Sequence, residues 1–92
     1  MKKLNKREDL LKCKDKVIAF WSKGGDRDAL PHFYEWVTKI NEGKLFVRIY
    51  KNGRWERERE DGEDISKYQF KGNDWFVMEH GECIKRRIME EL

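Results

Sequence analysis

Apolar and polar residues alternate along residues 44–50, and such alternation predicts a β-strand with one buried face. The strand leads into Asn52-Gly53, a pair that readily adopts the positive φ angles of a type I′ turn. A two-residue turn sets the register of a hairpin, so that Tyr50 faces Trp55 across the strands. One face of this hairpin is aliphatic on its first strand and carries glutamates on its second. The other face carries Phe46, Arg48, Tyr50, Trp55, Arg57 and Arg59.

Helical spacing of apolar residues predicts two helices before this hairpin. The first begins near Asn5, which together with Glu8 has the spacing of an N-cap and its reciprocating carboxylate. Residues 16–22 fit either the end of this helix or a short strand, and periodicity leaves the choice open. The second helix begins after Asp26 and ends at Gly43. Its apolar stripe, which we assign to the core, comprises Leu30, Phe33, Tyr34, Val37 and Ile40.

Two further strands are predicted after the hairpin, at residues 66–70 and 75–79, and Phe70 pairs with Trp75 in this second hairpin. Apolar residues four apart, Ile84, Ile88 and Leu92, favour a closing helix over residues 82–92, although a fifth strand also fits there. The predicted fold class is therefore α+β. It has two N-terminal helices, a four-stranded antiparallel meander and a C-terminal helix in a single small domain, residues 1–92.

Composition indicates a small, highly charged chain that nevertheless folds. Charged residues make up 42% and apolar residues 38%, but the four tryptophans, three tyrosines and five phenylalanines can form a core. Cys13 and Cys83 are too few for a disulfide scaffold, which favours free thiols in a reducing cytoplasm. No apolar run approaches the roughly 20 residues of a membrane-spanning helix, so no membrane association is expected.

Positive charge is concentrated in two segments of the chain. Residues 1–24 carry eight basic and three acidic groups, and residues 44–59 carry six and two. An acidic stretch at residues 60–64 follows and offsets part of this charge. The basic segments favour an anionic partner, whereas the acidic stretch offers the same arginines a counter-charge within the chain.

The aromatic and basic face of the hairpin is the candidate binding site. Its residues, with two basic side chains added from the turn, are Phe46, Arg48, Tyr50, Lys51, Arg54, Trp55, Arg57 and Arg59. Aromatic rings can stack on the bases of single-stranded RNA or DNA, and guanidinium groups can neutralise phosphates. Arg48 directly opposite Arg57 would also require a negative partner, because like charges across a ladder repel each other. We therefore predict a nucleic-acid-binding regulatory domain, without distinguishing RNA from DNA.

Two alternatives use the same residues differently. In a structural interpretation, the rings form a second small core and the arginines pair with the acidic stretch. In a functional one, tryptophan and arginine are the anchors of a protein interface. The protein would then be a small regulator or inhibitor of a nucleic-acid-handling machine, of phage or plasmid type. A homodimer formed through an exposed edge strand is compatible with each hypothesis.

A small metal-independent ribonuclease is a third functional hypothesis. His80 or Glu79 would act as general base, and Arg86 or Arg87 would stabilise the phosphorane. No sequence motif places these groups together, so we assign no catalytic residue.

The soft metal ligands of the chain are Cys13, His32, His80 and Cys83. Only His80 and Cys83 are close in sequence, and no second tight pair completes a zinc site. We therefore predict neither a metal site nor a cofactor.

Overall fold

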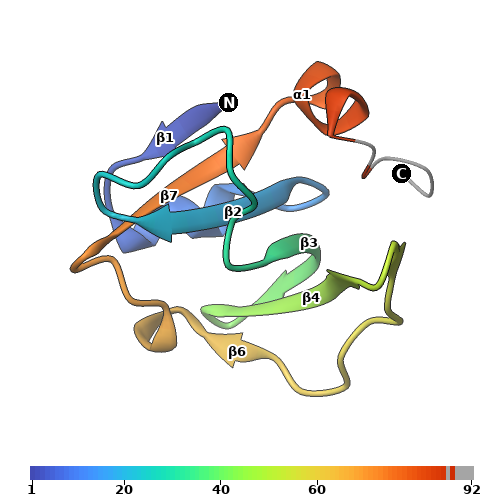
Figure 1. The fold of residues 1–92 in the computed structure, drawn as a ribbon. Helices are drawn as coiled ribbons and strands as arrows, with labels where there is room; N and C mark the ends of the chain where they lie inside the picture. The colour runs from blue at the N-terminus through green and yellow to red at the C-terminus, as the bar shows by residue number, and fades with distance from the viewer. Residues whose placement is uncertain (87, 89–92) are drawn as a thin grey trace.

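The alternating residues 44–50 form most of strand β4 (Lys44–Lys51) in the computed structural model, and this strand pairs with the strand before it in the central hairpin. Strand β3 (Tyr34–Asn41) runs antiparallel to strand β4 (Figure 1). The turn between them is Glu42-Gly43, where both φ angles are positive, at 52° and 74°. A two-residue turn of this type has a twist that matches the twist of the strands that it joins.

The structure describes residues 1–86 and 88, and seven strands of this part form one antiparallel sheet. The other strands are β1 (Lys2–Leu4), β2 (Val17–Ser22), β5 (Arg54–Trp55), β6 (Glu63–Asp64) and β7 (Asn73–Met78). The helical elements are the 3₁₀ turns η1 (Arg7–Lys12) and η2 (Ile65–Lys67) and the short helix α1 (His80–Lys85). The strand order is β1-β7-β2-β3-β4-β5, with β6 also paired to β4 (Figure 1). The predicted fold of two N-terminal helices and a four-stranded meander is therefore wrong.

The predicted first helix is reduced to the 3₁₀ turn η1. Asp9, not Glu8, supplies the capping carboxylate, since its Oδ2 accepts from the backbone N–H of Asn5 at 3.1 Å and of Lys6 at 3.2 Å. Residues 17–22, which the pattern left open, form strand β2. This strand is flanked on both sides by neighbours in the sheet, and its β-branched and aromatic residues suit such a position.

The predicted second helix is strand β3, preceded by a loop. Its apparent helical spacing arises from a register shift between Val37 and Lys39, where β3 bulges against β4. Because of this bulge, Val37 and Ile40 pack into the same core cluster although they are three residues apart. Tyr34 contributes to the opposite cluster. A bulged strand therefore reproduced the spacing of one face of a helix.

The predicted second hairpin is also wrong, because its strands find other partners. Residues 65–67 form η2, and β7 pairs with β2 and β1 instead. The rings of Tyr68 and Phe70 still pack against Trp75, at centroid distances of 5.3 and 5.7 Å. The predicted neighbours are thus in contact through side chains and not through a strand ladder.

The C-terminal helix is confirmed only as the short α1. Of its predicted apolar stripe, Ile88 is buried as expected, but Ile84 is 57% exposed and Cys83 is buried in its place. Residues 87 and 89–92, which include Leu92 of the predicted stripe, lie outside the described residues. None of the helices in the described ranges has the length and apolar character needed to cross a membrane.

Buried side chains form two clusters, one on each face of the sheet. Val17 and Ile18 fall in different clusters, as do Phe76 and Val77, because adjacent strand residues point to opposite faces. The first cluster includes Leu10 of η1, and the second is completed by α1 and Ile88. The Cα radius of gyration of 12.3 Å is that of a small compact domain of this length.

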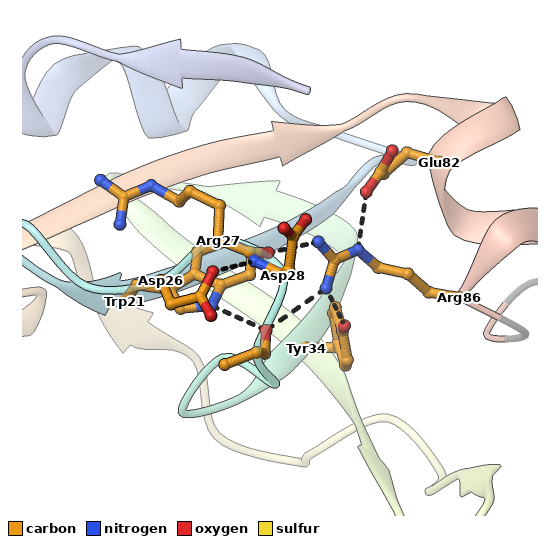
Figure 2. Close-up of polar contacts among 8 residues, drawn as sticks. Trp21, Asp26, Arg27, Asp28, Tyr34, Glu82 and Arg86 are labelled. Atoms are coloured by element: carbon orange, nitrogen blue, oxygen red, sulfur yellow. Dashed lines mark hydrogen bonds and ion pairs between the residues drawn. The ribbon is translucent and has the colours of Figure 1, made fainter.

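The loop between β2 and β3, residues 23–33, is held against the body of the domain by Arg86 (Figure 2). The guanidinium group donates to Glu82 at 2.7 Å, to the Tyr34 hydroxyl at 3.2 Å and to the backbone carbonyl of Arg27 at 2.6 Å. It also lies 5.4 Å from the centroid of the Trp21 ring. Arg86, the C-cap residue of α1, therefore anchors this loop to strands β2 and β3.

A second arginine, which belongs to this loop, also holds the loop against the sheet. Arg27 forms an ion pair with the buried Asp74 of β7 and lies 4.9 Å from the Phe76 ring centroid. Lys3 of β1 reaches the other carboxylate oxygen of Asp74 at 3.5 Å. Burial alone would raise the pKa of Asp74, but the hydrogen bond from Arg27 and the charge of Lys3 hold it below its usual value.

Candidate functional site

The predicted hairpin turn is confirmed at Asn52-Gly53, with φ angles of 54° and 80°. Tyr50 pairs with Trp55, and Lys51 with Arg54, in the predicted register. Beyond Trp55 the regular ladder ends. Lys51 and Arg54 are exposed at the tip of the hairpin.

The second strand of the hairpin is shorter than predicted. The N–H of Glu56 donates to Ile49 as expected, at 2.9 Å, but Val47 then accepts from Arg59, at 3.0 Å, one residue later than a regular ladder requires. The predicted cross-strand pair of Arg48 and Arg57 is therefore not formed in a ladder. Residues 56–62 instead follow the outer edge of β4 as an irregular segment that leads from β5 to β6, and we call it the crossing segment.

The predicted aromatic and basic residues do not form one exposed surface. Trp55 is only 4% exposed, and its Nε1 donates to the carbonyl of Ile88 at 2.8 Å. Arg48 lies 4.9 Å from the Trp36 ring centroid and donates to the carbonyl of Glu56 at 2.6 Å. Tyr50 packs beside Trp55 in the second cluster. Among the predicted rings, Trp55 is thus not available for stacking on a base.

The other predicted residues lie elsewhere on the domain. Phe46 is half-buried, with the Nζ of Lys39 at 4.6 Å from its ring centroid. Arg57 and Arg59 are exposed and belong to the crossing segment. Both line a large open cavity that the sequence did not predict.

This cavity has a volume of about 980 Å³ and lies between the sheet and the crossing segment. Its wall on the sheet side comes from β2, β3, β4 and β7, and its other wall continues from the crossing segment past η2. The crossing segment is fixed at the rim, because Glu58 accepts a hydrogen bond from the hydroxyl of Thr38. A large concave site of this kind is the default place to look for ligand binding.

Aromatic rings line one side of the cavity. Phe20 stacks on Trp75 with centroids 4.4 Å apart, and Phe33 lies 6.2 Å from Phe20. Tyr68 and Trp75 are buried, whereas Phe33 is 53% exposed. The rings thus form a continuous apolar surface that reaches from the first core cluster out to solvent.

Glu35 of β3 is the polar group in this aromatic environment. The hydroxyl of Tyr68 hydrogen-bonds to its carboxylate, and Oε2 is buried and has no hydrogen-bond partner in the described part of the chain. Burial raises the pKa of Glu35 to about 7, although the Tyr68 hydrogen bond and the charge of Arg59 oppose this shift. Burial and the adjacent carboxylate also raise the pKa of Tyr68, so its hydroxyl stays protonated.

Carboxylates outnumber basic groups around the cavity. The acidic lining residues are Glu35, Glu56, Glu58, Glu60, Asp61 and Glu63, and the basic ones are Arg57, Arg59 and Lys67. The cavity is therefore negative on a chain whose net charge is +3. A strongly shifted carboxyl in a cleft is a functional-site candidate, and the sign of this cleft favours a cationic ligand.

A second cavity, of about 480 Å³, lies between β1, β2 and α1. Four lysines of the N-terminal basic segment border it: Lys2, Lys3, Lys12 and Lys16. The buried thiols of Cys13 and Cys83 border it as well. Burial raises the pKa of Cys13 and raises that of Cys83 to about 11, so neither thiol is an effective nucleophile at neutral pH.

The groups of the ribonuclease hypothesis do not converge on a substrate site in the described chain. Arg86 is occupied by Glu82 and the 23–33 loop (Figure 2), and Arg87 lies outside the described residues. His80 is exposed at the start of α1, where Glu79 is the N-cap. Within residues 1–86 and 88, no three His, Cys, Asp or Glu side chains are grouped so as to hold a metal ion.

Sequence reasoning missed Glu35 because it placed this residue on a helix, where a lone glutamate is an ordinary exposed residue. In a strand, Glu35 shares a face with Val37, so the charge points into the first core cluster. A glutamate between Tyr34 and Trp36 was the available signal.

Comparisons of the chain with protein-family models, curated proteins and solved structures found no match.

Proposed function

We propose that this domain binds another protein through the negative aromatic cavity and the loop beside it. The observation that carries the proposal is the half-buried Glu35, which lies among aromatic rings beneath a rim rich in carboxylates. Such a site combines apolar contact area with a charge that selects the sign of the partner. The proposal develops the protein-binding regulator hypothesis and moves its interface from the hairpin face to the cavity.

The 23–33 loop supports the proposal because it presents apolar side chains next to the cavity. Leu30 is 83% exposed and Phe33 is 53% exposed, and Phe33 also lines the cavity. Arg27 and Arg86 hold the loop in place through hydrogen bonds and ring contacts. A loop that is ordered before binding loses less conformational entropy when a partner docks.

The test is capture of partners with immobilised domain from nuclease-treated lysate, comparing wild type with the double variant Leu30→Ser and Phe33→Ser. The matched control is Leu11→Ser, an exposed leucine on η1 that is 39% exposed and does not border the cavity. We expect the same proteins to be retained by wild type and control and lost by the double variant. Equal retention by all three would refute the proposed interface. Thermal melts verify that each variant is folded.

Nucleic-acid binding is the second candidate function, and one observation favours it. Lys51 and Arg54 face each other directly at the exposed tip of the hairpin, and like charges in that position repel unless an anion lies between them. A phosphate of single-stranded RNA or DNA would relieve this repulsion. The test is fluorescence anisotropy with labelled oligonucleotides at increasing salt. Binding that is absent or insensitive to salt, or unchanged in Lys51→Ser/Arg54→Ser, would exclude it.

Both candidate functions can hold together if the partner is itself a nucleic-acid-handling protein of the cytoplasm. Capture that survives nuclease treatment supports direct protein binding, and capture that requires intact nucleic acid supports the second candidate. Light scattering on the same samples tests the homodimer predicted through an edge strand. The edge strand β1 begins with two lysines, which oppose pairing with a second copy.

A further inference from the structure

Building on the proposed function, we infer that the cavity receives one basic side chain of the partner, with Glu35 as the counter-ion of its ammonium or guanidinium group. The inference concerns the ligand class and follows from the hydrogen-bonding state of Glu35, the rings around it and the sign of the local charge. Each of these points to a cation with an apolar stem.

The first argument is the unpaired oxygen of Glu35. Buried acceptors in proteins nearly always have a donor, yet Oε2 has none among residues 1–86 and 88. The hydroxyl of Tyr68 also donates to this carboxylate. Glu35 lines an open cavity, so a rotation of its side chain would bring the buried Oε2 to a donor from outside the chain. A charged N–H donor forms the strongest bond to a carboxylate.

The second argument is the aromatic lining. Phe20, Phe33 and Trp75 border the cavity together with Glu35. Phe20 and Trp75 stack on each other and on His32 and Phe70, so they offer the ligand apolar surface, which suits the methylene stem of lysine or arginine. An anionic or purely polar ligand would gain little from these rings.

The third argument is the charge of the rim, which includes one internal competitor. Arg59 is near enough to lower the pKa of Glu35, but within the described residues it forms no ion pair with that carboxylate. Its positive charge therefore repels an entering cation without satisfying Oε2. Removal of this charge is expected to strengthen ligand binding, whereas removal of the Glu35 charge is expected to weaken it.

A nucleobase is the main competing ligand, since a carboxylate and aromatic rings can also recognise a base. The six carboxylates of the lining would repel the phosphates attached to that base. A free nucleotide is therefore included in the experiment as a competing probe.

The experiment uses the intact chain at pH 8 and constant ionic strength, with ligand titrations followed by NMR. The probes are n-butylammonium and n-propylguanidinium, with n-butanol as the neutral analogue and cytidine monophosphate as the nucleotide. We expect both cations to shift the Trp75 indole N–H and the Glu35 carboxyl carbon, and butanol and the nucleotide to leave them unchanged. The relative affinity of the two cations distinguishes a lysine from an arginine ligand.

Variants make the test specific. Glu35→Gln is expected to lower cation affinity about tenfold, the effect of losing one charge-assisted hydrogen bond. Arg59→Gln is expected to raise cation affinity about threefold, because it removes one exposed positive charge. Glu8→Gln, an exposed glutamate on η1 away from the cavity, is the control and is expected to match wild type. A purely structural role of Glu35 would not produce opposite effects in the first two variants.

Three results would overturn the inference: equal cation binding by wild type and Glu35→Gln, equal binding of butanol and butylammonium, or stronger binding of the nucleotide. If the two cations do not bind while partner capture still depends on Leu30 and Phe33, the inference is wrong and the proposed interface stands. If capture is equal in all variants while the cations bind through Glu35, the cavity is a site for a small cation and the proposed interface is wrong.

Discussion

The hydroxyl of Tyr68 and the carboxylate of Glu35 are joined by a hydrogen bond that links the chain after η2 to strand β3. This bond stabilises the ionised form of Glu35, whose pKa burial raises. Tyr68→Phe is expected to raise the Glu35 pKa above its wild-type value of about 7 and to cost about 1 kcal/mol of stability. Carbon-13 NMR titration of the carboxyl group and urea unfolding measure the two effects. An unchanged Glu35 pKa would contradict the role given to the bond.

The same carboxyl makes the stability of the domain depend on pH. The folded state holds the Glu35 proton up to about pH 7, whereas the unfolded chain releases it near its ordinary value of 4.5. The stabilisation associated with this group is therefore fully present below pH 4.5 and is lost as the pH rises through 7.

Glu35→Gln is expected to remove this loss of stability. Tyr68, Arg59 and Glu63 are the other charged or titratable groups that act on Glu35, and the variant leaves them in place. Urea unfolding of wild type and variant between pH 5 and 8 checks the prediction. The free energy of unfolding should fall more steeply with pH in wild type, and parallel curves would contradict the assignment.

Arg86→Met is expected to destabilise the domain by about 2 to 3 kcal/mol, because the guanidinium group bonds Glu82, the Tyr34 hydroxyl and the loop carbonyls. The control is Lys85→Met, the exposed preceding residue at the end of α1. Hydrogen exchange should show faster opening of the 23–33 loop in the first variant only. Equal exchange in the two variants would mean that Arg86 does not anchor the loop.

Gly62→Ala tests how tightly the crossing segment packs on β4. A Cβ at this position would lie 2.8 Å from ring atoms of Phe46 and 2.9 Å from the Cβ of Lys44, closer than such atoms normally approach. We expect a loss of about 1 to 3 kcal/mol in urea unfolding. Gly81→Ala is the matched control, because a Cβ there meets no atom within 4 Å and alanine favours the helix. Equal stability of the two variants would contradict the close packing.

The parts of the fold that depend on neighbouring residues were predictable from the sequence. The turn at Asn52-Gly53 follows from the φ angles that these two residues tolerate, and it sets the pairing of Tyr50 with Trp55. The ladder beyond it was not predictable, because the crossing segment slips by one residue to reach η2 and β6. That slip depends on contacts with distant parts of the chain.

The errors in the prediction have a common cause in long-range pairing. Strand β7 is bordered by β2 and β1, and nothing local to residues 73–78 indicates those partners. The bulge after Val37 gave β3 the spacing of a helix. Once β3 was assigned as a helix, the inward direction of Glu35 could not be inferred, and the candidate site was missed with it.

Arg48, for which we predicted a negative partner, contacts two backbone carbonyls and an aromatic ring in the described part of the chain. Backbone carbonyl oxygens of Trp55 and Glu56 accept from the guanidinium group, and the face of Trp36 lies beneath it. Carbonyl dipoles and ring quadrupoles have no signature in a count of charged residues, so the pattern of charges alone suggested an external anion.

The pairing of β1 with β7 has a consequence for how the chain folds. Lys2 lies opposite Val77, so this ladder cannot form until residue 77 has been synthesised. The β3–β4 hairpin needs only neighbouring residues and can form much earlier. We expect mutations in the Glu42-Gly43 turn to slow folding and mutations in β1 mainly to speed unfolding. During synthesis, the basic N-terminal strand then stays unpaired until β7 has emerged from the ribosome.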